Sequence, residues 1–223
     1  MTSRRLAALL VLLPLAMPVL AQTEKPVTAM TVSYGTLRQD DLVLRIRNDD
    51  IDIRFIPLDP RVMRLLANDA FQALRTLRET QRRAIDSVAS RAGVTEPGLA
   101  LVTFFGQHPD TRFDPQTLTL LVRNRVFRPL GVIPLGAKFN SQQLGVREQA
   151  SAIYLFEEEI PVNDSFSLSY GAETSDDWQG KQTTLDRERA RVAARAREQP
   201  RDTSRRRSRL LVPQYPLRRL SGH

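Results

Sequence analysis

Apolar and polar residues alternate along two neighbouring segments near the start of the chain. In residues 41–47 and 50–55, every second residue is apolar. A period of two is typical of a β-strand with one buried face and one solvated face. Asn48 and Asp49 separate the segments, and both residue types tolerate turn conformations. The pattern predicts a β-hairpin with the solvated residues Asp41, Arg45, Arg47, Asp50, Asp52 and Arg54.

Residues 69–92 change to helical spacing, with one apolar stripe at Phe71, Leu74, Leu77, Ile85 and Val88. Asp69 is the expected N-cap, and Gln72 is its expected capping-box partner. Gly93 is the expected left-handed residue after the last turn. On the outer face the four-residue spacing predicts two ion pairs, Glu79–Arg83 and Arg82–Asp86.

Strand-like runs return after this helix. They are bounded by glycine, proline and acidic residues, and they fall at 99–105, 118–122, 126–127, 132–133, 150–156 and 166–170. Seven to nine short strands and one long amphipathic helix predict a mostly β (α+β) fold. We expect an antiparallel β-sandwich or barrel-like sheet, with the helix packed over one side or end.

The first 21 residues have the pattern of a secretory signal peptide. Arg4 and Arg5 precede an uncharged apolar run, and Val19-Leu20-Ala21 is a small-x-small cleavage site. The alternative is a retained anchor, but the run is shorter than the about 20 residues that a spanning helix needs, and it holds Pro14 and Pro18. We expect cleavage near Ala21 and a periplasmic or extracellular protein.

Charge divides the rest of the chain into a domain at 22–180 and a basic tail at 181–223. The first part holds 18 Lys+Arg against 21 Asp+Glu, and the second holds 13 against 4. Within the tail, residues 184–198 have a thin apolar stripe that is compatible with a helix. Residues 199–223 contain arginine, three prolines and little core material, so we expect them to be disordered.

The basic tail is the strongest functional indication in the sequence. Its candidate anion-binding residues are Arg205, Arg206, Arg207, Arg209, Arg218 and Arg219. Export makes nucleic acid an unsuitable partner, whereas anionic lipid head groups attract such clusters. The alternative is a solvated tail without a partner. Trp178 either contributes to an interface or closes the core.

No pattern predicts catalytic, cofactor-binding or metal-binding residues. His108 is the one histidine besides the C-terminal His223, and the chain has no cysteine and no Gly-x-Ser-x-Gly elbow. Disulfides and thiolate metal sites are therefore excluded. Acidic clusters occur at 49–52, 157–159 and 176–177, and we interpret them as solvated turns rather than calcium ligands.

These features favour an exported, non-enzymatic binding or structural protein of the cell envelope. Its domain would bind an envelope protein or glycan, and its tail would contact anionic surfaces. One alternative is an exported hydrolase that uses domain carboxylates. Another is a subunit of a surface assembly that pairs through exposed strand edges.

Overall fold

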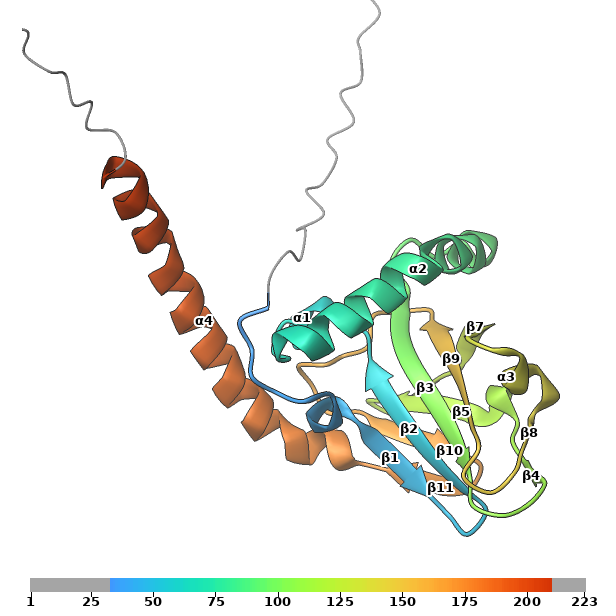
Figure 1. Ribbon diagram of the computed structural model, residues 1–223. Coiled ribbons are helices and arrows are strands. Elements are labelled where there is room, and N and C mark those ends of the chain that lie inside the picture. Colours follow the sequence, from blue (N-terminus) through green and yellow to red (C-terminus); the bar gives the residue numbers. More distant parts are fainter. Residues whose placement is uncertain (1–32, 210–223) are drawn as a thin grey trace, which may run out of the picture.

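The computed structural model describes residues 33–209, with side chains through residue 197. A five-stranded antiparallel sheet lies at its centre, in the order β1-β2-β3-β9-β7 (Figure 1). These strands span Leu44–Arg47 (β1), Ile51–Pro57 (β2), Gly98–Gly106 (β3), Gln149–Phe156 (β9) and Pro129–Pro134 (β7). The predicted hairpin is confirmed, because Leu44 pairs with Phe55 and Arg47 with Asp52.

A second antiparallel sheet packs against the first, in the order β11-β10-β5-β6. Its strands are Glu173–Ser175 (β11), Ser167–Tyr170 (β10), Leu118–Val122 (β5) and Arg125–Phe127 (β6). Apolar side chains of both sheets fill the space between them. The Phe55 ring centroid lies 6.3 Å from that of Phe156 and 6.4 Å from that of Phe166. The predicted antiparallel sandwich is therefore confirmed.

Shorter elements lie before and between the strands of the two sheets. They are the 3₁₀ turns Gln39–Leu42 (η1) and Pro115–Thr117 (η2), the helices Pro60–Met63 (α1) and Ala137–Ser141 (α3), and the paired strands Thr111–Arg112 (β4) and Gln143–Leu144 (β8). None of the four helical pieces was apparent in the hydrophobic pattern, because each is too short to show a helical period.

The predicted long helix is α2, which spans Asn68–Ala92. Its stripe is buried or half-buried as expected, and Gly93 ends it in the left-handed conformation with φ 70°. The N-terminal prediction is wrong, because the N-cap is Ala67 and Asp69 lies in the first turn. One predicted ion pair forms, Arg82–Asp86 at 3.7 Å, whereas Glu79 pairs with Arg75 at 2.7 Å.

A second long helix, α4, spans Asp177–Arg209 and differs from the expected tail at both ends. It begins before 184, because the Trp178 side chain is fully buried and its ring lies 5.1 Å from Phe166. It also continues through residues 199–209, which we expected to be disordered. Trp178, Leu185 and Val192 repeat every seven residues, so they form one buried stripe that crosses the expected boundary at 180. Trp178 closes the core.

Candidate functional site

The outer face of the five-stranded sheet is divided into an apolar half and a polar half. Helix α2 contacts β7 and β9, and Figure 1 shows it lying across one end of the sheet. At that end the face carries Ile56, Leu101 and Ile153, which are neighbours in register. Further along the strands, the same face carries polar residues: Asp52, Arg54, Thr103, Gln149 and Ser151.

A pocket of about 390 Å³ opens on the polar half, and we call it the sheet-face pocket. It is lined by Asp52, Arg54, Phe105, Gly106, Gln107, Val146 and Arg147. Its volume falls in the range of small-molecule sites, about 300–1,000 Å³. β2 and β3 are interior strands of the sheet, so their backbone groups are already paired. A ligand here would be recognised mainly by side chains.

Asp52 overturns its predicted position on a solvated face, because it is 3% exposed. Its Oδ2 accepts a hydrogen bond from Arg47 Nη2 at 2.8 Å. Its Oδ1 is buried and has no hydrogen-bond partner among the described residues. The loops that follow β1 and β3 cover this end of the sheet, as the hydrogen bond from Gln107 N to Asp50 O shows. The alternation of residues within one hairpin carries no information about other segments that pack over it.

Arg54 lies two residues along β2 on the same face. Its guanidinium stacks over the Phe105 ring at 4.5 Å from the centroid, a cation–π geometry. Its Nε is buried and has no partner among the described residues. An unmade hydrogen bond of a buried polar group costs about 1–3 kcal/mol. Asp52 and Arg54, which both line the pocket, therefore each carry one buried polar atom without a partner among the described residues.

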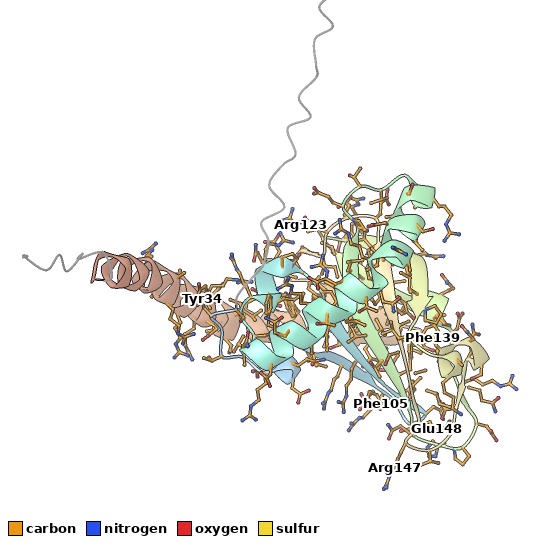
Figure 2. All side chains as sticks on the ribbon, turned by 45° about the horizontal axis from the view of Figure 1, so that its top comes forward. Tyr34, Phe105, Arg123, Phe139, Arg147 and Glu148 are labelled. Atoms are coloured by element: carbon orange, nitrogen blue, oxygen red, sulfur yellow. The ribbon has the colours of Figure 1, made fainter. Side chains whose placement is uncertain are left out.

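The loop between β8 and β9 forms one wall of the pocket and is fixed from two sides. Glu148 accepts hydrogen bonds from Gly145 N and from Lys138 Nζ, both at 2.8 Å. The Lys138 bond holds the pKa of Glu148 below its ordinary value. Arg147 adopts a left-handed conformation with φ 60°, which is strained for a residue with a side chain. Figure 2 shows Phe105, Arg147 and Glu148 together at this end of the molecule.

Gly106 permits the close contact between this loop and β3. A methyl group on Gly106 would lie 2.5 Å from Gly145 O. The two segments are joined by hydrogen bonds from Gly106 N to Glu148 O and from Arg147 N to Gly106 O, both 3.0 Å. The wall of the pocket is therefore built on paired backbone.

The polar half of the sheet has an excess of positive charge. Arg45 lies directly opposite Arg54 in the β1–β2 register, and Arg47 lies opposite Asp52. Like charges that face each other across strands destabilise a sheet. With Arg147 in the pocket wall, this half of the sheet carries four arginines, of which Arg47 pairs with Asp52. An anionic group bound here would reduce this repulsion.

A smaller pocket of about 180 Å³, the corner pocket, lies between β5, β6 and the segment that follows β9. Its interior is apolar, with Leu120, Val122, Phe127, Phe156 and Ile160 among the lining residues. Two ion pairs join charged lining residues around it, Arg123–Asp164 at 2.8 Å and Arg125–Glu158 at 3.2 Å. All four side chains are more than half exposed, so each pair contributes less than about 1 kcal/mol.

The base of α4 is held by a buried carboxylate. Glu188 is 1% exposed and accepts hydrogen bonds from Thr36 N and Thr36 Oγ1, both at 3.0 Å. Arg195 at 3.1 Å and Arg191 at 3.4 Å provide the countercharges. Burial alone would raise the pKa of Glu188, but these hydrogen bonds outweigh it and hold the pKa below its ordinary value.

Three arginines of the predicted basic tail, all within the possible helix at 184–198, therefore have structural contacts. Arg191 and Arg195 pair with Glu188, and Arg195 also donates to Tyr34 O. Arg189 donates to Asp186 and to Val162 O. These bonds fix the first half of α4 to the domain and to the segment that begins at residue 33.

Beyond this base, α4 leads away from the domain, and we call residues 198–209 the arm (Figure 1). Four of the six candidate residues, Arg205, Arg206, Arg207 and Arg209, lie in the last turns of the arm. Positive charge near a helix C-terminus is favourable because carbonyl groups there are unpaired. The other two, Arg218 and Arg219, lie outside the described residues, as does the signal-peptide prediction.

The remaining predicted candidates are scattered. His108 is exposed in the turn between β3 and β4, and Asp110 bonds to Gln143 instead. Among the side chains that the structure describes, no three of His, Asp or Glu lie together as metal ligands do. Glycoside hydrolysis uses two carboxyl groups about 5–10 Å apart. Among the lining residues of the sheet-face pocket, Asp52 is the one carboxylate, whereas the corner pocket is lined by Glu158, Glu159 and Asp164.

The sheet edges bear on the assembly alternative. β7 begins and ends with proline, and β6 has three residues, with Val126 60% exposed. β1 lies against β11, as the contacts between them show. Proline and short length are common ways to protect a sheet edge from pairing.

Comparison with known proteins gives no family. No protein-family model, curated protein or solved structure matches this chain. Among the helices of the described part, none has the length and apolar character to cross a membrane.

Proposed function

We propose that this protein is an exported, non-enzymatic binding protein of the cell envelope, whose basic arm contacts anionic surfaces. The signal-peptide pattern supports export, and the charge difference between domain and tail supports an anionic partner. The domain carries the ligand-binding function, and the arm holds it close to a negatively charged layer such as lipid head groups.

The arrangement of α4 is the observation that carries this proposal. Its first half is packed through Trp178, Leu185 and Val192 and fixed by the bonds of Glu188. The same helix continues for several turns past Arg197. A helix that is anchored at its base presents its far end at a defined distance from the domain. Arginines at that end can approach a surface without moving the sandwich.

Vesicle co-sedimentation tests the proposal. The probe is the chain from Gln22, mixed with vesicles of phosphatidylcholine and phosphatidylglycerol at 3:1, or of phosphatidylcholine alone, at low and high salt. The test variant carries Arg205→Gln, Arg206→Gln, Arg207→Gln and Arg209→Gln. Each arginine near an anionic surface contributes about 1 kcal/mol, so the variant should bind at least tenfold more weakly than the wild type.

A matched control removes the same charge from the domain. It carries Arg64→Gln, Arg83→Gln, Arg91→Gln and Arg112→Gln, which are all exposed positions outside the arm. Binding of the control should stay within threefold of the wild type. Equal losses in both variants would show a general charge effect, and salt-independent binding by the arm variant would contradict the proposal.

A further inference from the structure

The sheet-face pocket has chemical features that the arm proposal does not use. Two of its buried polar atoms, Asp52 Oδ1 and Arg54 Nε, have no partner among the described residues. The residues Asp52 and Arg54 both line the sheet-face pocket. Buried polar groups in folded proteins are paired in the great majority of cases. Two unpaired groups of opposite type in one pocket therefore indicate a missing partner with a donor and an acceptor.

The charges around the pocket indicate which kind of ligand group would accept a hydrogen bond from Arg54. Arg45 and Arg54 face each other across β1 and β2, and Arg147 is held in the wall by a strained backbone. Guanidinium groups bind carboxylate and phosphate oxygens through paired N–H donors. The ligand group at Arg54 is therefore an anion, which also reduces the repulsion between the facing arginines.

Asp52 indicates which kind of ligand group would donate a hydrogen bond in the pocket. Its Oδ1 can only accept a hydrogen bond while the carboxyl is ionised. A purely anionic ligand would place negative charge beside this carboxylate. A ligand that carries hydroxyl groups next to its acid group satisfies both Asp52 and Arg54.

The position of the pocket in the sheet favours a small cyclic ligand over an extended peptide. Peptides commonly add to a sheet by pairing with the backbone of an edge strand. Here the strands are β2 and β3, whose backbones already pair on both sides. Recognition must come from side chains, and a volume of about 390 Å³ admits a ligand of small-molecule size.

We propose that the sheet-face pocket binds an acidic saccharide, with its carboxylate on Arg54 and a ring hydroxyl donating to Asp52 Oδ1. This inference names the class of ligand that the domain binds. It rests on the proposed function in one respect, namely that the cell envelope is the source of the glycan. The arm plays no part in it, so the two proposals fail separately.

Titration calorimetry tests the saccharide site in the chain from Gln22 with the four arm arginines replaced by glutamine. The probes are a hexasaccharide of uronic acid, a neutral hexasaccharide of glucose and a hexaglutamate peptide. The uronic hexasaccharide should bind at least tenfold more tightly than either other probe. Arg54→Gln should weaken it at least tenfold, and Asp52→Asn should abolish its advantage over hexaglutamate.

Matched controls come from the Arg123–Asp164 pair, which lies at the corner pocket (Figure 2 labels Arg123 far from Arg147). Arg123→Gln and Asp164→Asn should leave saccharide binding within twofold. If Asp52→Asn does not fold, the NMR signal of Arg54 Nε–H in the unsubstituted pocket replaces it. That signal should move with the uronic hexasaccharide and not with the neutral one.

Three results would overturn the proposal. Equal affinity for hexaglutamate would identify a general anion or acidic-peptide surface. Equal affinity for the neutral hexasaccharide would remove the role of the arginines. If no probe binds and the Arg54 signal does not move, water provides the hydrogen bonds of Asp52 Oδ1 and Arg54 Nε, and the pocket is not a saccharide site. Vesicle binding by the wild-type arm would be unaffected in every case.

Discussion

Replacing Glu188 tests how α4 is joined to the domain. In Glu188→Ala, two donors of Thr36 lose their acceptor, while Arg191 and Arg195 lose a countercharge. The side chains of Arg191 and Arg195 are 58% and 38% exposed, so water can solvate them after the ion pairs with Glu188 are lost. The Thr36 donors are part-buried, and hydrogen bonds to a charged group contribute about 1.5–3 kcal/mol. We expect a loss of about 3 kcal/mol in the free energy of unfolding.

Urea unfolding followed by circular dichroism measures this loss at pH 7. Glu188→Gln keeps the shape and one acceptor oxygen, so it should lose about 1 kcal/mol. The control is Glu79→Gln, which removes an exposed helical ion pair with Arg75 and should cost about 0.5 kcal/mol or less. If Glu188→Ala unfolds within 0.5 kcal/mol of the wild type, the buried carboxylate does not hold α4.

The pH dependence of the same difference has a defined sign. The pKa of Glu188 is lowered in the folded state, against an unfolded value of about 4.3. Its ionisation therefore stabilises the fold above about pH 5, and this contribution is lost as the pH falls through the folded-state pKa. The gap between wild type and Glu188→Gln should be constant from pH 5 to 8 and should narrow at lower pH. A gap that widens toward acid would contradict the assignment.

Three further predictions concern the helix, the sheet and export. Ending the chain after Arg197 should leave the urea midpoint unchanged, whereas ending it after Gly180 removes Leu185, Glu188 and Val192 and should cost more than 3 kcal/mol; equal midpoints would refute the packing of α4. Gly131→Ala would place a methyl group 2.4 Å from Val88 Cγ1 and should lower the free energy of unfolding by about 1–3 kcal/mol. Gly180 lies in a helix and faces open space, so Gly180→Ala should raise the free energy of unfolding by about 0.5–1 kcal/mol. Thermal unfolding measures both changes. Mass spectrometry of the protein from the envelope fraction should find Gln22 as the first residue, and an intact Met1 would show that no cleavage occurs.

Local patterns in the sequence were sufficient for much of the fold. The β1–β2 hairpin and the apolar stripe of α2 follow from periods of two and 3.6, which depend on neighbouring residues alone. The predicted antiparallel sandwich required only the number and length of the apolar runs.

The parts that sequence reasoning missed depend on contacts between distant residues. Glu188 interrupts the apolar stripe of α4, so the stripe was underestimated; its partner Thr36 lies 152 positions away. Asp52 fits a solvated position by alternation, but loops from elsewhere in the chain bury it. An acidic residue on the apolar stripe of a helix is a signal that could have identified Glu188, whereas Asp50 and Arg54, the same-face neighbours of Asp52, gave no such signal.

The central claim, that the arm and not the sandwich meets an anionic surface, can be measured directly. The chain has no cysteine, so Ser208→Cys in the arm and Ser87→Cys on α2 each give one site for a polarity-sensitive fluorophore. When anionic vesicles are added, we predict that the label at 208 shifts its emission to the blue at low salt and that the label at 87 does not change. A shift at 87 alone, or at neither position, would contradict the account.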